Sequence, residues 1–396
     1  MNVTTASSLL NPNALVIVMS SSSKFKYTIE QPLPDYIPSK MLASTQDVFT
    51  DRDVFEQELE AIFDSDWVMM GRAGAIPDPG NYFTAALGER PVILMRQKDL
   101  SIKAMANYCL HRYTQLLKGS GTTRHIVCPY HYWSYALDGQ LEGVTNRQGF
   151  CPEDVANEKL ESLACEVYMG YIFVSLKSDL EPVATRLAGL HDVLANFGLE
   201  RYEDHYVEHQ DTWNANWKLI VHNFIESYHV TYTHKKSIGS TNPTKVAEYG
   251  PIGEPYYTVH SNSYAPDYCP DVFNPRLDAR EKGRFYVMGV FPNGLIAIDP
   301  NFVWWLALEP LAANKTNSRW GVSFLPETLK GTADPKKFIQ DTVDLLVTAT
   351  SEDKEMVERM QSGSKFGSVK AGVLHAPLEI HIKEFDDYVR RQMGGE

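Results

Sequence analysis

Two short pairs of metal-binding residues lie close together within the stretch CLHRYTQLLKGSGTTRHIVCPYH, residues 109–131. The first pair is Cys109 and His111, the second is Cys128 and His131, and sixteen residues separate the pairs. Four such side chains on two loops predict a bound metal, either zinc or an iron–sulfur cluster. Because each pair mixes one cysteine with one histidine, the pattern favours a 2Fe-2S cluster, with two thiolates on one iron and two imidazoles on the other. A structural zinc site is the alternative.

The residues around these pairs form short alternating or apolar runs from residue 67 to about residue 176. Turn sequences such as DPG, GER, QKD and LDG separate the runs, which is typical of a small antiparallel β unit. We expect the two pairs to lie at the tips of two hairpins in that unit. Residues 51–67, just before it, carry apolar side chains at helical spacing and predict an amphipathic helix.

Helices and strands are mixed after residue 177. The pattern predicts helices at residues 180–198, 216–234, 338–363 and 380–393, and strands at residues 284–291, 294–300, 302–310 and 318–327. The predicted fold class is therefore α+β: a small antiparallel β domain ahead of a larger domain whose antiparallel sheet is covered by helices. No G-x-G-x-x-G or P-loop sequence follows a strand, so no nucleotide site is predicted.

Net charge, hydropathy and cysteine content limit the partners and the cellular compartment that we expect. The net charge of −13 argues against a nucleic-acid partner. The longest apolar run near the start, residues 14–19, is too short to cross a bilayer, and no basic residue precedes it as in a signal peptide. Five cysteines, an odd number, predict free thiols in a reducing compartment, and we expect a cytoplasmic protein. Residues 1–24, rich in Ser, Thr and Asn, are expected to form a poorly ordered arm.

A second group of candidate ligands lies in NWKLIVHNFIESYHVTYTH, residues 216–234. His229 and His234 are five residues apart, which on an ideal helix places them about 140° apart around the axis. They do not share one helix face. If both bind one metal, one of them must lie at a helix end or at a bulge.

These two motifs together resemble the Rieske oxygenases. CPYHYWSYALDGQL is similar to the strand and turn that follow the first ligands in that family, and NWK-x(4)-N-x-x-E-x-Y-H-x(4)-H resembles its mononuclear-iron motif. The family completes that site with a distant carboxylate on a helix, and Asp353 in SEDKEMVE falls on the matching position. The resemblance implies that Cys109 and Cys128 hold one cluster iron and His111 and His131 the other. It also implies a facial triad of His229, His234 and Asp353 on Fe(II).

The resemblance assigns further roles near the triad. Glu226 matches the acidic residue that links the mononuclear-iron histidine to a cluster histidine of the neighbouring subunit, which would join His229 to His131 of another chain. Asn223 also matches and is expected to line the site. Glu226, with its short spacing from Asn223, is similar to the branch that oxidises carnitine, choline and glycine betaine.

The chain also departs from the family. It has Tyr113 and Tyr132 where glycine is usual, and His222 where glutamate is frequent. The two tyrosines remove no ligand but alter the surface beside the cluster. His222 puts any family role at that position in doubt.

The resemblance implies the catalytic alpha subunit of an oxygenase that uses O2 and electrons from a separate NAD(P)H-dependent flavin/iron-sulfur reductase. A homotrimer is implied too. The chain would divide into an arm at 1–24, a segment at 25–66 packing on the catalytic domain, the Rieske domain at 67–176 and the mononuclear-iron domain at 177–396. The expected reaction is monooxygenation of a methylated amine or quaternary ammonium compound, with N-demethylation or C–N cleavage as its expected outcomes.

Aromatic residues after the second motif are candidates for a substrate pocket. A cage of aromatic rings binds a quaternary ammonium group through cation–π attraction. We expect Tyr257, Tyr286 and Trp305 to line the pocket, with Tyr256 and Trp304 as further candidates. Such side chains on alternating strands also suit an ordinary core.

Three alternatives remain at this point. An aromatic-ring hydroxylating dioxygenase, or an O-demethylase acting on an aromatic acid, would use the same metal sites. A Rieske electron carrier would need only the cluster, and a zinc-binding interaction protein would need neither iron site.

Overall fold

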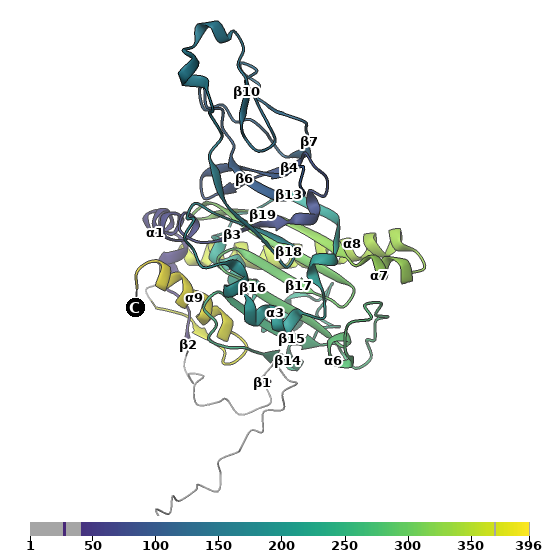
Figure 1. Ribbon diagram of the computed structural model, residues 1–396. Helices are drawn as coiled ribbons and strands as arrows, with labels where there is room; N and C mark the ends of the chain where they lie inside the picture. Colours follow the sequence, from purple (N-terminus) through teal and green to yellow (C-terminus); the bar gives the residue numbers. More distant parts are fainter. Residues whose placement is uncertain (1–26, 29–40, 368–369, 396) are drawn as a thin grey trace, which may run out of the picture.

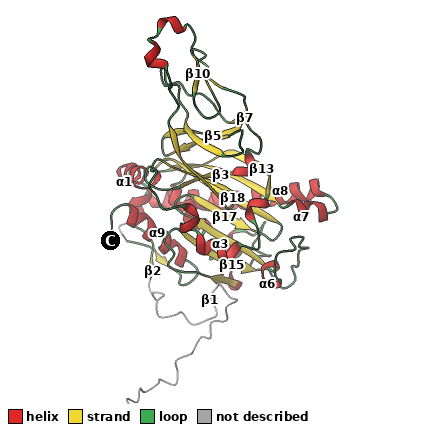
Figure 2. Cartoon of the chain, in the orientation of Figure 1, coloured by secondary structure: helices red, strands yellow, loops and turns green. Residues whose placement is uncertain are grey.

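The computed structural model describes residues 27–28, 41–367 and 370–395, so the arm expected at residues 1–24 lies outside the described chain. Two large sheets lie one above the other in the view of Figure 1, with a small third sheet at the upper tip. Helices gather around the larger, lower sheet (Figure 2). The predicted α+β class is confirmed: a small antiparallel β part precedes a larger, helix-covered antiparallel sheet.

The upper large sheet has seven strands in the order β3-β12-β11-β6-β5-β4-β7, with antiparallel pairing throughout. In chain order its strands are β3 (Val68–Arg72), β4 (Asn81–Leu87), β5 (Arg90–Arg96), β6 (Ile102–Ala106), β7 (Ser120–Thr122), β11 (Ser162–Tyr168) and β12 (Tyr171–Ser175). The runs predicted as strands from the alternation pattern form β3 to β6 and β12. Strand β11 was not predicted, because most of its side chains are half-buried and its pattern lacks a clear polar face.

The small sheet at the tip has three strands, β8 (Ile126–Val127), β9 (Ser134–Tyr135) and β10 (Leu141–Gly143). The second pair of candidate ligands lies in the β8–β9 hairpin, as predicted. The first pair does not lie at a hairpin tip, because the flanking strands β6 and β7 pair with other strands. Its turn is closed locally instead, by hydrogen bonds from the Cys109 amide to the Thr114 carbonyl and from the Tyr113 amide to the Cys109 carbonyl.

The lower sheet has eight strands in the order β1-β14-β15-β16-β17-β18-β19-β13. These are β1 (Tyr27–Thr28), β13 (Glu203–Trp213), β14 (Ala247–Tyr249), β15 (Tyr257–Ser263), β16 (Arg284–Val290), β17 (Gly294–Ile298), β18 (Phe302–Ala312) and β19 (Lys315–Phe324). The four strands predicted between residues 284 and 327 are confirmed as β16 to β19. The edge strand β13 was not predicted, because its sequence EDHYVEHQDTW is too polar to show an apolar face.

The helices are α1 (Arg52–Glu58), α2 (Val183–Arg186), α3 (Ala188–Leu194), α4 (Trp217–Phe224), α5 (Val230–Thr233), α6 (Ala279–Lys282), α7 (Pro326–Gly331), α8 (Pro335–Ser364) and α9 (Ile380–Gln392). Helix α4 contacts strands β16 and β18 on one side and helices α8 and α9 on the other, so it forms a layer between the sheet and the outer helices. Strands β2 (Met41–Leu42) and β20 (Val373–Leu374) form a separate short pair. Within the described part of the chain, none of the helices has the length and hydropathy of a membrane-crossing segment.

Three predicted helices are shorter than expected, and the one predicted over residues 180–198 divides into α2 and α3. The first begins at α1, where the Asp51 carboxylate accepts hydrogen bonds from the amides of Asp53 and Val54, and continues as a π-helical turn to Phe63, short of Trp67. The helix predicted over 216–234 divides into α4 and α5. The Glu226 carboxylate accepts hydrogen bonds from the amides of Tyr228 and His229, so these amides bond to a side chain instead of extending α4.

Helices α1 and α4 are joined by a buried ion pair. The Lys218 ammonium lies 2.5 and 2.7 Å from the two carboxylate oxygens of Glu58, and the Trp217 indole donates to Glu58 at 2.9 Å. The side chains of Lys218 and Glu58 are only 3% and 2% exposed. This pair fixes α4, and hence the turn that follows it, against the N-terminal part of the described chain.

Candidate metal centres

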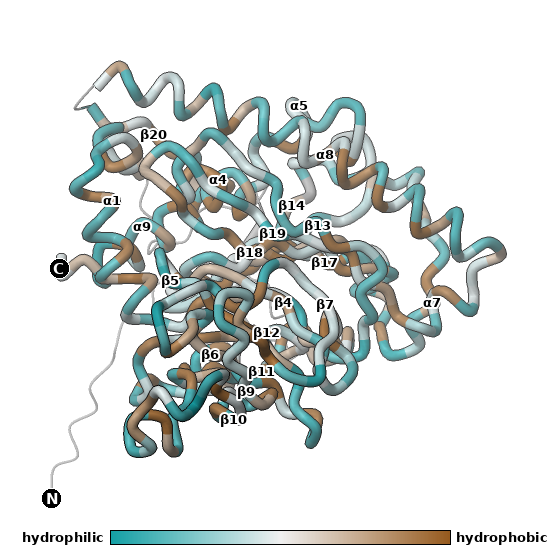
Figure 3. The backbone as a smooth tube through the Cα atoms, turned by 90° about the horizontal axis from the view of Figure 1, so that it is seen from above, coloured by the Kyte–Doolittle hydropathy of each residue, from teal (hydrophilic) through white to brown (hydrophobic). Residues whose placement is uncertain are grey.

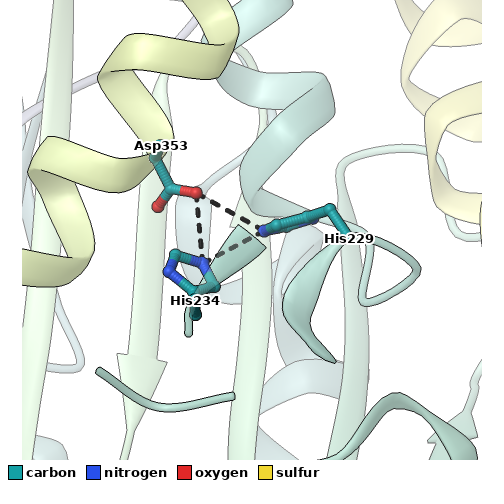
Figure 4. A group of neighbouring side chains, drawn as sticks. All are labelled: His229, His234 and Asp353. Atoms are coloured by element: carbon teal, nitrogen blue, oxygen red, sulfur yellow. Dashed lines mark hydrogen bonds and ion pairs between the residues drawn. The ribbon is translucent and has the colours of Figure 1, made fainter. Parts of the chain in front are cut away.

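His229, His234 and Asp353 converge in the lower body of the molecule (Figure 4). His229 immediately precedes α5 and His234 immediately follows it, so both histidines lie at helix ends, as the five-residue spacing predicted for at least one of them. Asp353 reaches the same point from the middle of α8. His229 Nε2 and His234 Nε2 are 3.2 Å apart, and Asp353 Oδ1 lies 3.4 and 3.1 Å from them, respectively.

The triad fits a single metal ion. Ligand atoms about 2.1 Å from one metal are separated by about 3.0 Å at right angles and about 3.4 Å in a tetrahedron, and the three distances fall in that range. The Asp353 oxygen is buried and has no properly aligned hydrogen bond within the described chain. A cation bound between the three side chains satisfies this atom, and two imidazoles with one carboxylate are a ligand set for ferrous iron.

The charges of the triad are strongly coupled. Burial alone disfavours the charged form of His229, but the carboxylates of Glu226 and Asp353 outweigh it and raise the pKa of His229 to about 10. Burial likewise opposes ionisation of Asp353, yet His234 and His229 lower its pKa well below the usual range. The site therefore provides a carboxylate and attracts positive charge.

Each histidine is oriented by a second carboxylate. Glu226 Oε1 is hydrogen-bonded to Nδ1 of His229, and Glu352 Oε2 lies 3.3 Å from Nδ1 of His234. Glu352 is itself held by the Lys236 amide at 3.0 Å and the Ser237 hydroxyl at 2.5 Å. Both rings thus present Nε2 to Asp353. The contact of Glu352 with His234 was not predicted, and its position directly before Asp353 is the one sequence signal for it.

A cavity of about 440 Å³, including its open mouth, lies beside the triad. Its floor is one row of side chains across four hydrogen-bonded strands: His260 on β15 is opposite Val287 on β16, Val287 is opposite Ala297 on β17, and Ala297 is opposite Trp304 on β18. We call these four residues the sheet floor. The two small side chains in its middle leave the space, and the triad faces this space from the helical side.

The three aromatic residues predicted to line the pocket do not reach this cavity. Tyr257, Tyr286 and Trp305 are 1%, 2% and 0% exposed and belong to a core cluster on the opposite face of the sheet. This prediction is corrected: successive side chains of a strand point to opposite faces, and the aromatic side chains that line the cavity are Trp304, Phe224 and Phe285. The Trp304 and Phe224 rings are 5.3 Å apart.

Polar groups also line the cavity, among them Asn223, as predicted, and His260. Burial, with repulsion from His381 and His229, lowers the pKa of His260 well below its ordinary value. His222, the departure noted in the sequence, does not line this cavity. Its Nε2 pairs with Asp386 Oδ1 of α9 at 2.7 Å, so it supports helix packing.

The first group of candidate ligands converges at the tip of the molecule. Cys109 and Cys128 are each 1% exposed, and Nδ1 of His111 lies 3.1 Å from Nδ1 of His131. Burial raises the pKa of the Cys109 thiol, while hydrogen bonds from Tyr135 and the His111 amide oppose that rise. All five cysteines of the chain are free thiols. Two buried thiols and two facing imidazole nitrogens fit a cluster with mixed ligands.

Side chains around the tip support these ligands. The Tyr135 hydroxyl lies 3.2 Å from Cys109 Sγ and 3.1 Å from the Leu110 amide, and the Trp133 ring stacks on His111 with centroids 5.0 Å apart. Tyr113 and Tyr132 have φ angles of 58° and 60°, where glycine is favoured, and their side chains point into solvent. The histidine edge of the tip is therefore bordered by exposed aromatic rings.

The two candidate centres are far apart within one chain. In Figure 1 the tip is at the top and the helical layer with α8 is in the lower body. In Figure 3, the perpendicular view, β9 and β10 lie at one side and α5 and α8 at the other. The separation in both views implies that the fold alone does not bring the tip to the triad of the same chain.

Each candidate centre lies in a segment that matches a known domain family. Residues 66–158 match the Rieske 2Fe-2S domain, and residues 198–395 match the catalytic domain of the ring hydroxylating alpha subunit. Carnitine monooxygenase oxygenase subunit from Acinetobacter baumannii is 28% identical over 334 residues, 80% of this chain and 84% of that protein. Choline monooxygenase from Beta vulgaris is 26% identical over 380 residues, 92% of this chain and 80% of that protein.

Solved structures share the fold. The apo form of the quaternary ammonium Rieske monooxygenase CntA superposes with a TM-score of 0.73 and 25% identity, covering 92% of this chain and 99% of that one. Naphthalene 1,2-dioxygenase from Rhodococcus gives a TM-score of 0.75 at 21% identity, covering 89% of this chain and 94% of that one.

Proposed function

The chain belongs to the ring hydroxylating alpha subunit family and is a Rieske non-heme iron oxygenase with a 2Fe-2S cluster and a mononuclear iron, and we propose that it oxidises a methylated amine or quaternary ammonium compound. The cavity supports this substrate class, because the side chains of Trp304, Phe224 and Phe285 line it and aromatic rings attract an ammonium group. Similar proteins are named as monooxygenases of carnitine, glycine betaine and choline, and these names support the same substrate class.

We propose that His229, His234 and Asp353 hold the iron, and that Cys109, Cys128, His111 and His131 hold the cluster. The bound metals supply oxygen activation and one-electron transfer. The chain's own residues then orient and shield the reaction: Glu226 and Glu352 hold the protons on Nδ1 of the two iron histidines, and the sheet floor positions the substrate. One C–H bond becomes C–OH, while O2, two electrons and two protons also yield water. A hydroxylated carbon next to nitrogen breaks down into an amine and an aldehyde.

The reaction is tested with purified enzyme and a competent NAD(P)H-dependent reductase. We expect substrate-dependent O2 uptake and release of one aldehyde per turnover with methylated amines. A cis-diol formed from an arene, without aldehyde from any amine, would overturn the proposed substrate class. The aromatic alternative has one observation in its favour, since the same apolar rings suit a flat substrate and a naphthalene dioxygenase shares the fold.

Glu226 is the proposed electron bridge, because it contacts the iron histidine His229 and borders an open groove. Replacing it with glutamine keeps the shape but removes the charge that holds the His229 N–H. We expect turnover to fall by about 10–100-fold, with the cluster spectrum and iron content unchanged. The exposed Glu355 on α8, changed to glutamine, is the matched control. Wild-type turnover in Glu226→Gln would remove the bridge from the mechanism.

Tyr135 is expected to tune the cluster through its contact with Cys109. Hydrogen bonds to cluster ligands stabilise the reduced state, so Tyr135→Phe should lower the reduction potential. If the bond favours the reduced form by about 1.4 kcal/mol, the shift is about 60 mV for one electron. A spectroscopic redox titration measures it. Tyr130→Phe is the control, because Tyr130 is an exposed tyrosine of the same tip; equal shifts in both variants would contradict this role.

We further propose a homotrimer in which each cluster serves the iron of a neighbouring chain. The distance between the centres within one chain supports this. A solved quaternary ammonium Rieske monooxygenase, described as revealing inter-subunit electron transfer, supports it as well. Co-assembled Asp353→Ala and Cys128→Ser chains should regain activity that neither has alone. No recovery in verified mixed oligomers would contradict the proposal.

The remaining expectations stay predictions. The electron donor is proposed to be a separate NAD(P)H-dependent flavin/iron-sulfur reductase, and the cytoplasm is the proposed compartment. The division into parts at residues 25–66, 67–176 and 177–396 is supported by the two family segments, at 66–158 and 198–395.

A further inference from the structure

One wall of the cavity carries polar side chains whose hydrogen-bonding atoms have no role in the proposed mechanism. Asn242, His260 and Asn262 line the cavity and are only 5%, 2% and 4% exposed. Each has a buried polar atom without a hydrogen-bond partner among the described residues: Nδ2 of Asn242, Nδ1 of His260 and Oδ1 of Asn262. Buried polar groups are nearly always paired in folded proteins, so these atoms indicate a missing hydrogen-bonding partner.

The polar wall is fixed in place before any ligand arrives. His260 stacks on Tyr249 with ring centroids 5.3 Å apart. The Asn242 amide is oriented by the Thr241 hydroxyl, which donates to Asn242 Oδ1 at 2.9 Å, and the Thr241 carbonyl accepts from the Ala265 amide at 2.8 Å. That last bond ties the loop to the segment after β15. Asn262 lies two residues from His260 on the same face of β15.

Trp304 lies at the other end of the sheet floor and packs against Phe224, and we call these two residues the aromatic end, whereas Phe285 is paired with Asn262 of the polar wall. His260 and Trp304 are separated by three strand spacings, a span of about 14 Å between backbones. A substrate lying along the floor therefore meets the rings of Trp304 and Phe224 at one end and the polar wall at the other.

The charged side chains that line the cavity limit which substrate group can bind beside Asn242, His260 and Asn262. Among the described residues that line it, none is lysine or arginine, and the acidic ones are Glu226 and Asp353 at the triad. At the polar wall, a carboxylate on the substrate would be buried without a lysine or arginine partner among the described lining residues. The unpaired atoms also include both a donor, on Asn242, and an acceptor, on Asn262. A hydroxyl group both donates and accepts, whereas a carboxylate only accepts.

We propose that Asn242, His260 and Asn262 form a specificity subsite for an uncharged hydroxyl group, so that the enzyme selects amino alcohols over amino acid betaines. This inference rests on the proposed function, because it assumes that the substrate's ammonium group occupies the aromatic end.

The test measures binding by calorimetry to iron-loaded enzyme, without O2 or reductant. The probes are (2-hydroxyethyl)trimethylammonium, propyltrimethylammonium, (carboxymethyl)trimethylammonium and naphthalene. We expect the hydroxyl compound to bind about tenfold or more tighter than the propyl and carboxymethyl compounds. Asn262→Leu and His260→Phe should reduce this preference to about twofold or less. Asn262→Ser, which is smaller and still polar, covers the case in which the larger variants fail to fold.

Ser261→Ala is the matched control, because Ser261 lies between His260 and Asn262 on β15. Its hydroxyl points away from the cavity and accepts a hydrogen bond from Arg284. This variant should keep the full preference. Tighter binding of the carboxymethyl compound, or an unchanged hydroxyl preference in all of the subsite variants, overturns the subsite and leaves the proposed function standing. If naphthalene binds and no ammonium probe does, the proposed function fails and the subsite fails with it.

Discussion

Asp353→Ala abolishes iron binding outside the cluster and lowers substrate-dependent O2 consumption by more than about 100-fold. We expect a loss of activity this large because removing a residue that only supports a ligand already costs about 10–100-fold in metal affinity or activity, and Asp353 is itself a proposed ligand. Its oxygen is the one anionic ligand of the triad and lies within 3.4 Å of both histidine nitrogens. Without it, the triad retains two imidazole ligands and no anionic ligand for a divalent ion.

The measurement pairs metal analysis with the cluster spectrum. The spectrum should be unchanged, because the cluster ligands lie in the distant tip. Asp344→Ala is the matched control, since Asp344 is an exposed aspartate on the same helix, and it should keep iron and activity. Full iron content in Asp353→Ala, or activity within a few-fold of wild type, would refute the assignment of Asp353.

Lys218→Ala is expected to destabilise the fold by about 3–5 kcal/mol, because it leaves the buried carboxylate of Glu58 without its cationic partner. Burial raises the pKa of Glu58 and lowers the pKa of Lys218, and the main interaction that favours the charged form of each group is with the other. The intact ion pair contributes little to the free energy of unfolding. Removing one partner leaves an unpaired buried charge and destabilises the fold. Urea unfolding followed by circular dichroism measures the difference.

The loss of stability in Lys218→Ala should also depend on pH, and the direction of this dependence follows from the raised pKa of Glu58. In the variant the folded-state pKa of Glu58 lies further above its unfolded value, so the fold gains from protonating it. Stability is then lost as pH rises, and the deficit is larger at pH 8 than at pH 5. The double variant Glu58→Gln/Lys218→Met, which keeps an acceptor for the Trp217 indole, should recover most of the loss. A deficit that is the same at both pH values would show that Glu58 is not the cause.

The candidate cluster ligands could be picked out because metal chemistry restricts ligand types and spacings, whereas Asp353 was expected only from the resemblance to the family. The spacing of His229 and His234 even required a helix end, and both occupy one. The choice of aromatic residues failed for a geometric reason: Trp304 and Trp305 are adjacent, and only the register of β18 against β17 decides which one faces the cavity. The roles of Glu352 and His222 depend on contacts over more than a hundred residues, which a local pattern does not contain.

The sheet floor has a practical consequence for engineering. Val287 and Ala297 stand on hydrogen-bonded neighbouring strands, so the depth of the cavity is set by side-chain volume and not by a moving loop. Exchanges at these two positions would change the range of accepted molecules in discrete steps and leave the turn that carries His229 and His234 undisturbed. A small library of variants at these two positions is therefore enough to test larger and smaller amines as substrates.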